Sequence, residues 1–207
     1  EWLNDRKLAP PSKFTFCCPQ RFEDQKEVEA FERLKWDFRS ETGIDLEVWH
    51  RDLYDAELKS RPDLVADFFS GSGSLGLEAL SRGAKHCWFH ERERSALAVL
   101  RNNIAALDAG GLATVVTGDA WRCEHRGTEH GPYQLIFLDP PYRDAMNAGD
   151  DGAVFQFLAR LSPYAAPAAF LVLHHPAEIE YHSPDSGVWK AMISRQFGTN
   201  GITIFQR

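Results

Sequence analysis

The chain has 207 residues, of which 43% are hydrophobic, and this fraction is enough to build one domain with a sizeable core. Its formal net charge of −7 argues against a protein that coats nucleic acid through bulk positive charge, but not against a local basic patch. No apolar run is long enough to cross a bilayer, which argues against a membrane-spanning protein.

The first 62 residues differ in pattern from the rest and are interpreted as an amino-terminal extension, followed by one domain over residues 63–207. Within the extension, Glu23–Thr42 is rich in charge and carries apolar residues at helical spacing, so it predicts a helix that ends at Gly43. No signal peptide is visible, but the chain begins at Glu1 rather than Met. We therefore expect a cytoplasmic protein, or one of an organellar matrix if a targeting segment has been removed.

From Leu64 onward, short apolar runs alternate with amphipathic stretches, which is the pattern of strands and helices in an α/β fold. The first run, Leu64–Phe69, predicts a buried strand, and a glycine-rich turn leads from it into a helix over Leu75–Ser81 that Gly83 ends. The same patterns predict strands at 86–90, 113–117, 134–138 and 168–173, helices at 93–107 and 154–161, and a closing hairpin of strands 189–197 and 202–206.

Three glycines and one acid indicate a cofactor site. Gly71, Gly73 and Gly76 form a G-x-G-x-x-G motif directly after the first strand and at the start of a helix. In this context glycines allow a sharp turn and let the backbone approach a nucleotide-type cofactor. Glu91 ends the second strand, 20 residues after Gly71, where an acid binds ribose hydroxyls. These four residues fit S-adenosylmethionine and NAD equally well.

Two further acids bear on the identity of the cofactor. Asp67 lies inside the first strand, where a dinucleotide fold places an apolar residue and a methyltransferase places an acid near the methionine part of its cofactor. A buried carboxylate is costly unless it is paired or hydrogen-bonded, so a purely structural role is the alternative. Asp119 follows the third strand, where it can accept a hydrogen bond from the adenine amine, although Asp after Gly118 is also a common turn. Asp67 therefore favours S-adenosylmethionine.

The segment Asp139-Pro140-Pro141-Tyr142 follows the fourth strand, beside the cofactor crevice expected at the switch point of the sheet. The amine of a nucleic-acid base is a poor nucleophile because its lone pair is delocalised into the ring. The Asp139 carboxylate and the backbone carbonyl of Pro140 can accept its two N–H bonds and favour a pyramidal nitrogen, and the prolines stiffen the turn that aims the carbonyl. Tyr142 can stack on the base. The alternative, an ordinary Pro-Pro turn, would explain the two prolines but not the acid and the aromatic residue that flank them.

The four cysteines are two adjacent and two scattered residues, which is neither a disulfide framework nor a paired metal motif. They are interpreted as reduced thiols. Cys123 lies near His125 and His130, but three ligands at irregular spacing are weak evidence for zinc. No metal is predicted.

Several of these motifs resemble those of a known family. The runs Asp67–Ala84, Phe89–Glu93 and Leu135–Tyr142 resemble the RsmD-type ribosomal RNA guanine-N2 methyltransferases, and Gln196–Phe205 is similar to the final hairpin of that family. The resemblance implies a Rossmann-like class I methyltransferase fold, with a mostly parallel seven-stranded sheet and a C-terminal antiparallel hairpin. It also implies S-adenosylmethionine as the methyl donor and a guanine of small-subunit ribosomal RNA as the acceptor.

The chain departs from this family in two places. The region before Asp63 is acidic and lacks a basic, Arg- and Gly-rich start, and His174 stands where relatives tend to carry an acid. Because an acidic protein binds naked RNA weakly, the expected substrate is ribosomal RNA within a small-subunit particle. The candidates for a local grip on RNA are Arg82, Arg92, Arg94, Arg101, Arg143 and Lys190.

Three other functions stay open on the sequence. A DNA amino-methyltransferase fits Asp139–Tyr142, but the length leaves no room for a separate target-recognition domain. A catalytically silent ribosome-assembly or structural factor fits the acidic charge and the extension, but not the acids kept at Asp67, Glu91, Asp119 and Asp139. An NAD-dependent oxidoreductase leaves Asp139–Tyr142 unexplained.

Overall fold

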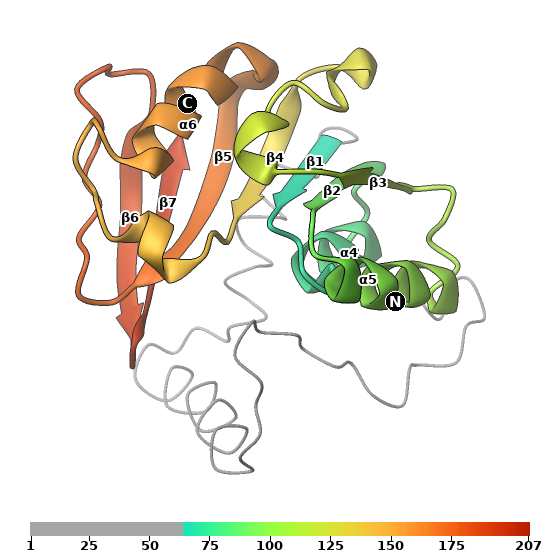
Figure 1. The fold of residues 1–207 in the computed structure, drawn as a ribbon. Coiled ribbons are helices and arrows are strands. Elements are labelled where there is room, and N and C mark those ends of the chain that lie inside the picture. Colours follow the sequence, from blue (N-terminus) through green and yellow to red (C-terminus); the bar gives the residue numbers. More distant parts are fainter. Residues whose placement is uncertain (1–63) are drawn as a thin grey trace.

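The computed structural model describes residues 64–207, so the predicted extension over residues 1–62 and its helix lie outside the described residues. The described part is a seven-stranded sheet in the order β3-β2-β1-β4-β5-β7-β6, with helices on both faces (Figure 1). The predicted fold class is confirmed. The parallel strands are β1 (Leu64–Phe68), β2 (His86–Glu91), β3 (Ala113–Thr117), β4 (Tyr133–Leu138) and β5 (Ala165–Pro176), and the antiparallel strands are β6 (Lys190–Phe197) and β7 (Asn200–Gln206).

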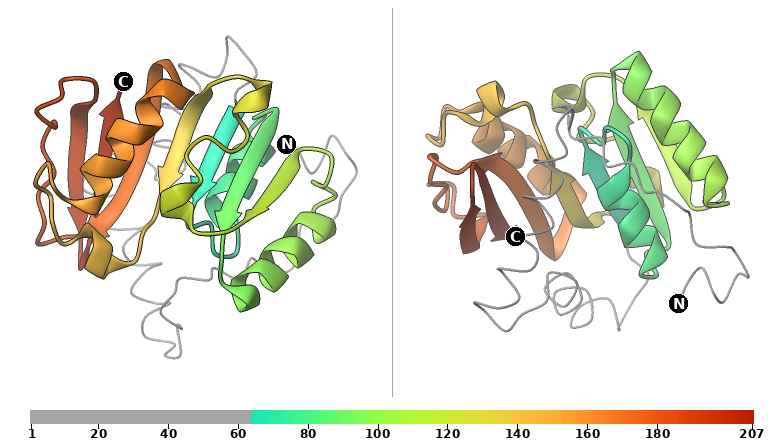
Figure 2. Two further views of the ribbon diagram at one scale, coloured as in Figure 1. Left: turned by 45° about the horizontal axis from the view of Figure 1, so that its top comes forward. Right: turned by 90° about the horizontal axis from the view of Figure 1, so that it is seen from below.

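The helices cover the two faces of the sheet unequally. Helices α4 (Ser74–Ser81) and α5 (Arg94–Ala106) lie on one face, and α6 (Ala153–Leu161) lies on the other (Figure 2). Alternate residues of each strand point to opposite faces, so Phe89 packs with α4 and α5 while Trp88 joins the cluster of α6. Because the central strands are buried on both faces, their sequences are mostly apolar and do not alternate strictly between apolar and polar residues.

Two strands differ from their predicted bounds. β5 is expected at 168–173 but extends in both directions. At its amino end Ala165 pairs with Tyr133 of β4, and at its carboxyl end His174 and His175 continue the ladder opposite Ile202 and Gly201 of β7. The hairpin turn is also tighter than the four-residue turn expected at 198–201. Phe197 pairs with Asn200, so the turn has two residues, and Gly198 adopts the positive φ of 56° that such turns need.

The connections beyond β3 contain short 3₁₀ turns that the sequence patterns did not predict. These are η1 (Ala120–Arg122), η2 (Thr128–His130), η3 (Tyr142–Ala145) and η4 (Ser162–Tyr164). Among residues 64–207, no helix is long and apolar enough to span a membrane.

One glycine sets how closely α4 approaches the sheet. A Cβ at Gly76 would lie 2.3 Å from Cε1 of Phe89 and 2.6 Å from Sγ of Cys87, both on the buried strand β2. We expect Gly76→Ala to lower the free energy of unfolding by about 1–3 kcal/mol, because the helix must move off the sheet. Urea unfolding measures this change.

The matched control is Gly111→Ala, in an exposed turn where a Cβ meets nothing within 4 Å. Its free energy of unfolding should change by less than about 0.5 kcal/mol. Equal effects of the two substitutions would contradict the packing argument.

Candidate functional site

The predicted site residues gather at one edge of the sheet. Strands β1 to β4 run parallel, so the residues that follow them meet at their shared carboxyl edge. Backbone hydrogen bonds continue the ladders past the strand ends: Asp139 N donates to Phe68 O at 3.3 Å, and Gly118 N donates to Glu91 O at 2.9 Å. The sheet order reverses between β1 and β4, where a crevice for a ligand is expected.

The glycine loop after β1 is tied to the end of β2. Phe69, Gly71 and Gly73 all have positive φ, so the chain turns sharply between the strand and α4. Gly71 N donates to Oε2 of Glu91 at 2.8 Å, and Oε1 of Glu91 accepts from the backbone N–H groups of Arg92 and Glu93. Three backbone donors therefore hold the Glu91 carboxylate in one orientation beside the loop.

Asp67 is the most deeply buried of the predicted acids, with 1% of its surface exposed. Its Oδ2 accepts from Gly76 N at 3.0 Å, which satisfies a free N–H in the first turn of α4. Burial raises the pKa of Asp67 to about 8, the Gly76 hydrogen bond opposes this, and the charges of Asp139 and Glu91 add to it. The observed contact is structural, and a contact between Asp67 and a cofactor stays a prediction.

Asp119 caps the short helix η1 at the end of β3. Its Oδ1 accepts from Trp121 N at 3.2 Å, and its carboxylate forms long ion pairs with Arg92 at 4.0 Å and Arg122 at 3.8 Å. About a third of the Asp119 side chain, 34%, is exposed. This carboxylate is therefore held in place but reachable by a polar group of a ligand.

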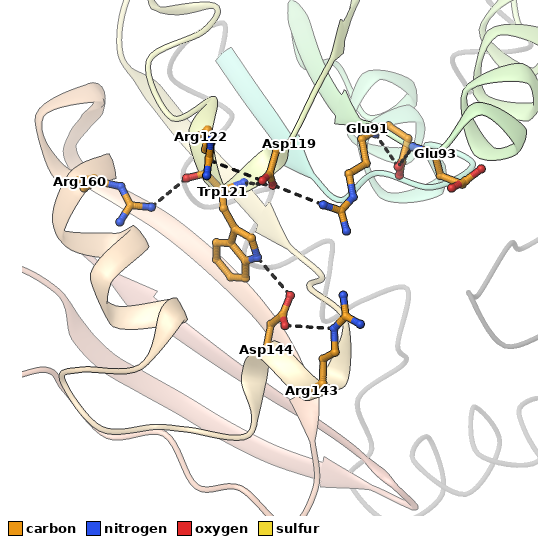
Figure 3. A network of polar contacts seen from close by, with 9 residues as sticks. Glu91, Glu93, Asp119, Trp121, Arg122, Arg143, Asp144 and Arg160 are labelled. Carbon is orange, nitrogen blue, oxygen red and sulfur yellow. Dashed lines mark hydrogen bonds and ion pairs between the residues drawn. The ribbon is translucent and has the colours of Figure 1, made fainter.

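Trp121 connects the loops around this edge, and the sequence patterns do not predict its contacts. Its indole Nε1 donates to Oδ2 of Asp144 at 3.2 Å, so the ring spans from the β3 loop to η3 (Figure 3). The Trp121 ring also meets Phe69 edge to face, with ring centroids 4.8 Å apart. The loops after β1, β3 and β4 are thus joined by one side chain.

Asp139 stands at the end of β4 in a cluster of four polar side chains. Oδ1 of Asp139 lies 2.6 Å from Nδ1 of His174, and Nε2 of His174 lies 3.1 Å from Oδ1 of Asn200. The Tyr142 hydroxyl donates to the same Asn200 oxygen and lies 3.4 Å from His174 Nε2. Pro140 is buried between Asp139 and the start of η3. The predicted residues Asp139, Pro140 and Tyr142 are therefore together.

His174 and Asn200 were not among the predicted site residues. In the sequence, His174 stands out only as a departure from relatives, and Asn200 lies in a predicted turn. Their contribution follows from pairing between β5 and β7, which places both near the end of β4. The one signal in the sequence is that His174, a polar residue, continues an apolar strand at its carboxyl end.

The arginines proposed to grip RNA do not form one group. Arg92 and Arg143 lie at the candidate site, where they pair with Asp119 and Asp144. Arg82 instead pairs with Glu78 at the far end of α4, as a solvent-facing helix pair does. Among residues 64–207, no cluster of His, Cys, Asp or Glu is arranged to hold a metal ion.

The chain matches one family model and several known proteins. The family model described as conserved hypothetical protein 95 matches residues 53–206. The chain is 32% identical over 146 residues to YlbH of Bacillus subtilis, whose name suggests an rRNA methyltransferase, and the match covers 68% of this chain and 74% of YlbH.

Two further matches come from Escherichia coli. The chain is 40% identical over 77 residues to ribosomal RNA small subunit methyltransferase D, but this covers only 37% of each chain. A solved structure described as a suggested methyltransferase, YhhF, superposes with a TM-score of 0.59 and 26% identity, over 78% of this chain and 85% of YhhF.

The buried Asp67 carboxyl predicts a pH effect on stability. Its pKa is about 8 in the folded protein, against an ordinary value of 3.8. Between these values the folded protein holds a proton that the unfolded chain has released, so the free energy of unfolding falls as pH rises. Asp67→Asn removes this titration and keeps an acceptor for Gly76. We expect the variant to gain stability relative to the natural protein from about pH 5 to about pH 8, by up to about 1.4 kcal/mol per pH unit.

Urea unfolding of both proteins at matched pH tests this expectation. Glu178→Gln, at an exposed position, is the control for loss of a surface carboxylate. If stability curves of the natural protein and Asp67→Asn run parallel over this range, Asp67 does not carry the raised pKa.

Proposed function

The chain belongs to the conserved hypothetical protein 95 family, which is the RsmD family, and we propose that it transfers a methyl group from S-adenosylmethionine to the exocyclic amine of a guanine in small-subunit ribosomal RNA. The match to YlbH supports the class of reaction, and the name of the Escherichia coli relative supports the substrate. The observation that carries the proposal is the segment Asp139–Tyr142 at the same sheet edge as the glycine loop, Glu91 and Asp119.

The side chains at this edge suit S-adenosylmethionine. Glu91 would accept hydrogen bonds from the ribose hydroxyls, because its Oε2 has one backbone donor and a second lone pair. Asp119 would accept from the adenine amine, since it is partly exposed and its ion pairs are long. The turn at Gly71 and Gly73 would let the backbone approach the ligand. When bound, this cofactor supplies a methyl group on a positively charged sulfur.

Asp139, Pro140 and Tyr142 would handle the acceptor base. The Asp139 carboxylate is 29% exposed and would accept one N–H of the amine, while the carbonyl of Pro140 would accept the other. The Tyr142 ring, held through its hydroxyl by Asn200, would stack on the base and fix its plane. Catalysis then depends mainly on positioning two bound reactants. A ribosomal substrate makes the cytoplasm the expected compartment.

Methyl transfer from labelled S-adenosylmethionine tests the proposal. We expect label to enter small-subunit particles or their ribosomal RNA, and nucleoside analysis to identify N2-methylguanosine. Asp139→Asn should lower kcat by about 100-fold or more, because a neutral amide accepts the amine N–H weakly beside a developing positive charge. Glu178→Gln, at an exposed position away from the site residues, is the matched control and should keep its activity.

The other outcomes separate the alternatives. Label in duplex DNA, with N6-methyladenine as product, would replace the RNA substrate by DNA. Cofactor binding without transfer to any substrate would favour a silent assembly factor. Either result would contradict the proposed function.

The acidic charge of the chain predicts a preference for an assembled substrate. With a net charge of −7, the protein should bind naked ribosomal RNA weakly, and proteins of the particle would supply further contacts. We expect kcat/KM at physiological salt to be at least about tenfold higher for small-subunit particles than for deproteinised RNA. Equal values for the two substrates would show that the particle contributes nothing to recognition.

A further inference from the structure

His174 occupies the centre of the polar cluster around Asp139. It lies near the carboxyl end of β5, and 24% of its side chain is exposed. Its Nδ1 lies 2.6 Å from Asp139 Oδ1, and its Nε2 lies 3.1 Å from Asn200 Oδ1. Both ring nitrogens therefore face oxygen atoms. His174 is the side chain that links the carboxylate after β4 to the carboxyl-terminal hairpin.

The partners of the ring determine its protonation state. An ionised Asp139 can only accept, so Nδ1–H of His174 donates to it. The amide oxygen of Asn200 accepts from both Nε2–H and the Tyr142 hydroxyl. A ring that donates from both nitrogens is an imidazolium. The pair of His174 and Asp139 then has no net charge.

The groups that face His174 come from each of the packed elements. They are Asp139 after β4, Tyr142 of η3, Asn200 of β7 and the neighbouring His175. Burial lowers the pKa of His174, but the hydrogen bond and charge of Asp139, together with Asn200, outweigh it and raise the pKa above its ordinary value. The imidazolium is therefore stabilised mainly by Asp139.

We propose that His174 is a positioning residue for methyl transfer, which fixes the Asp139 carboxylate through Nδ1–H and controls the charge beside the acceptor amine through the proton on Nε2. The inference rests on the proposed function, because it needs an amine at Asp139.

In the methyl-transfer step, the amine nitrogen forms a bond to the methyl carbon while the carbon–sulfur bond breaks. The electron pair of the broken bond stays on sulfur. The nitrogen becomes positive and then releases one proton to water.

Loss of the Nε2 proton favours this step. The ring still donates Nδ1–H to Asp139, but the pair of side chains changes from no net charge to −1. A negative charge close to the nitrogen stabilises the positive charge that develops there. Methyl transfer should therefore be slow while His174 is an imidazolium and should accelerate as the ring becomes neutral. The pH profile of kcat is predicted to have an acid limb that belongs to His174.

Two substitutions separate the two roles of the ring. In His174→Asn the amide nitrogen takes the place of Nδ1 and can still donate to Asp139, but it does not titrate. In His174→Gln the longer amide reaches toward Asn200 and leaves Asp139 without its donor. His182→Asn, at an exposed position, is the control for loss of a histidine.

The expected results differ for each variant. In the natural protein, kcat should rise by about tenfold or more along one single-proton limb. His174→Asn should show a flat profile over the same range, with kcat several-fold below the natural plateau. His174→Gln should lower kcat by about tenfold or more at every pH, with KM for the particle changed by less than about threefold. His182→Asn should reproduce the natural profile.

The result that overturns the inference is an acid limb in His174→Asn that matches the natural protein, or an unchanged kcat in His174→Gln. Absence of transfer by the natural protein would overturn the proposed function, and this inference with it. Imidazole ¹H–¹⁵N NMR titration provides a readout independent of activity. Asp139→Asn should lower the titration midpoint of His174, and an unchanged midpoint would show that the two side chains are not coupled.

Discussion

A sheet covered by helices on both faces leaves polar side chains few places except the ends of its strands, and this constraint organises the molecule. The central strands β1, β2 and β4 are buried between α4 and α5 on one side and α6 on the other. Polar chemistry is therefore concentrated where parallel strands stop, and their common direction brings those ends together. Glu91, Asp119 and Asp139 share an edge because three strands share a direction.

Two buried polar residues show the cost of breaking this rule. Asp67 accepts a hydrogen bond from α4, and its pKa is nevertheless raised by burial. His90, in β2, is stacked on Phe68, and neither of its ring nitrogens has a partner among the described residues. Burial lowers the pKa of His90 to about 3, so this ring remains neutral. The acids at the sheet edge avoid such costs, since backbone N–H groups, arginines or His174 hold them.

The sequence predicted the strands and the glycine- and proline-containing loops better than the contacts between them. Mostly apolar runs locate β1 and β4, and the glycine loop and Asp139–Tyr142 follow from local residue types. Local residue types do not reveal the contacts of Trp121, His174 and Asn200. Each acts through a partner distant in sequence, and the pairing of β5 with β7 decides which side chains meet. The carboxyl-terminal extension of β5 has the same cause, because backbone pairing with β7 extends the strand beyond the residues that its own sequence predicts.

The position of β7 has a consequence for how the protein is made. β7 follows the other described elements along the chain, yet it lies between β5 and β6 rather than at the rim of the sheet. A nascent chain that has reached only β6 leaves the backbone groups of β5 without a neighbour on that side. The same nascent chain lacks Asn200, and so the amide that joins Tyr142 and His174. The Asp139 cluster is therefore completed only after β7 has been synthesised and has paired with β5, so assembly of the site waits for this strand.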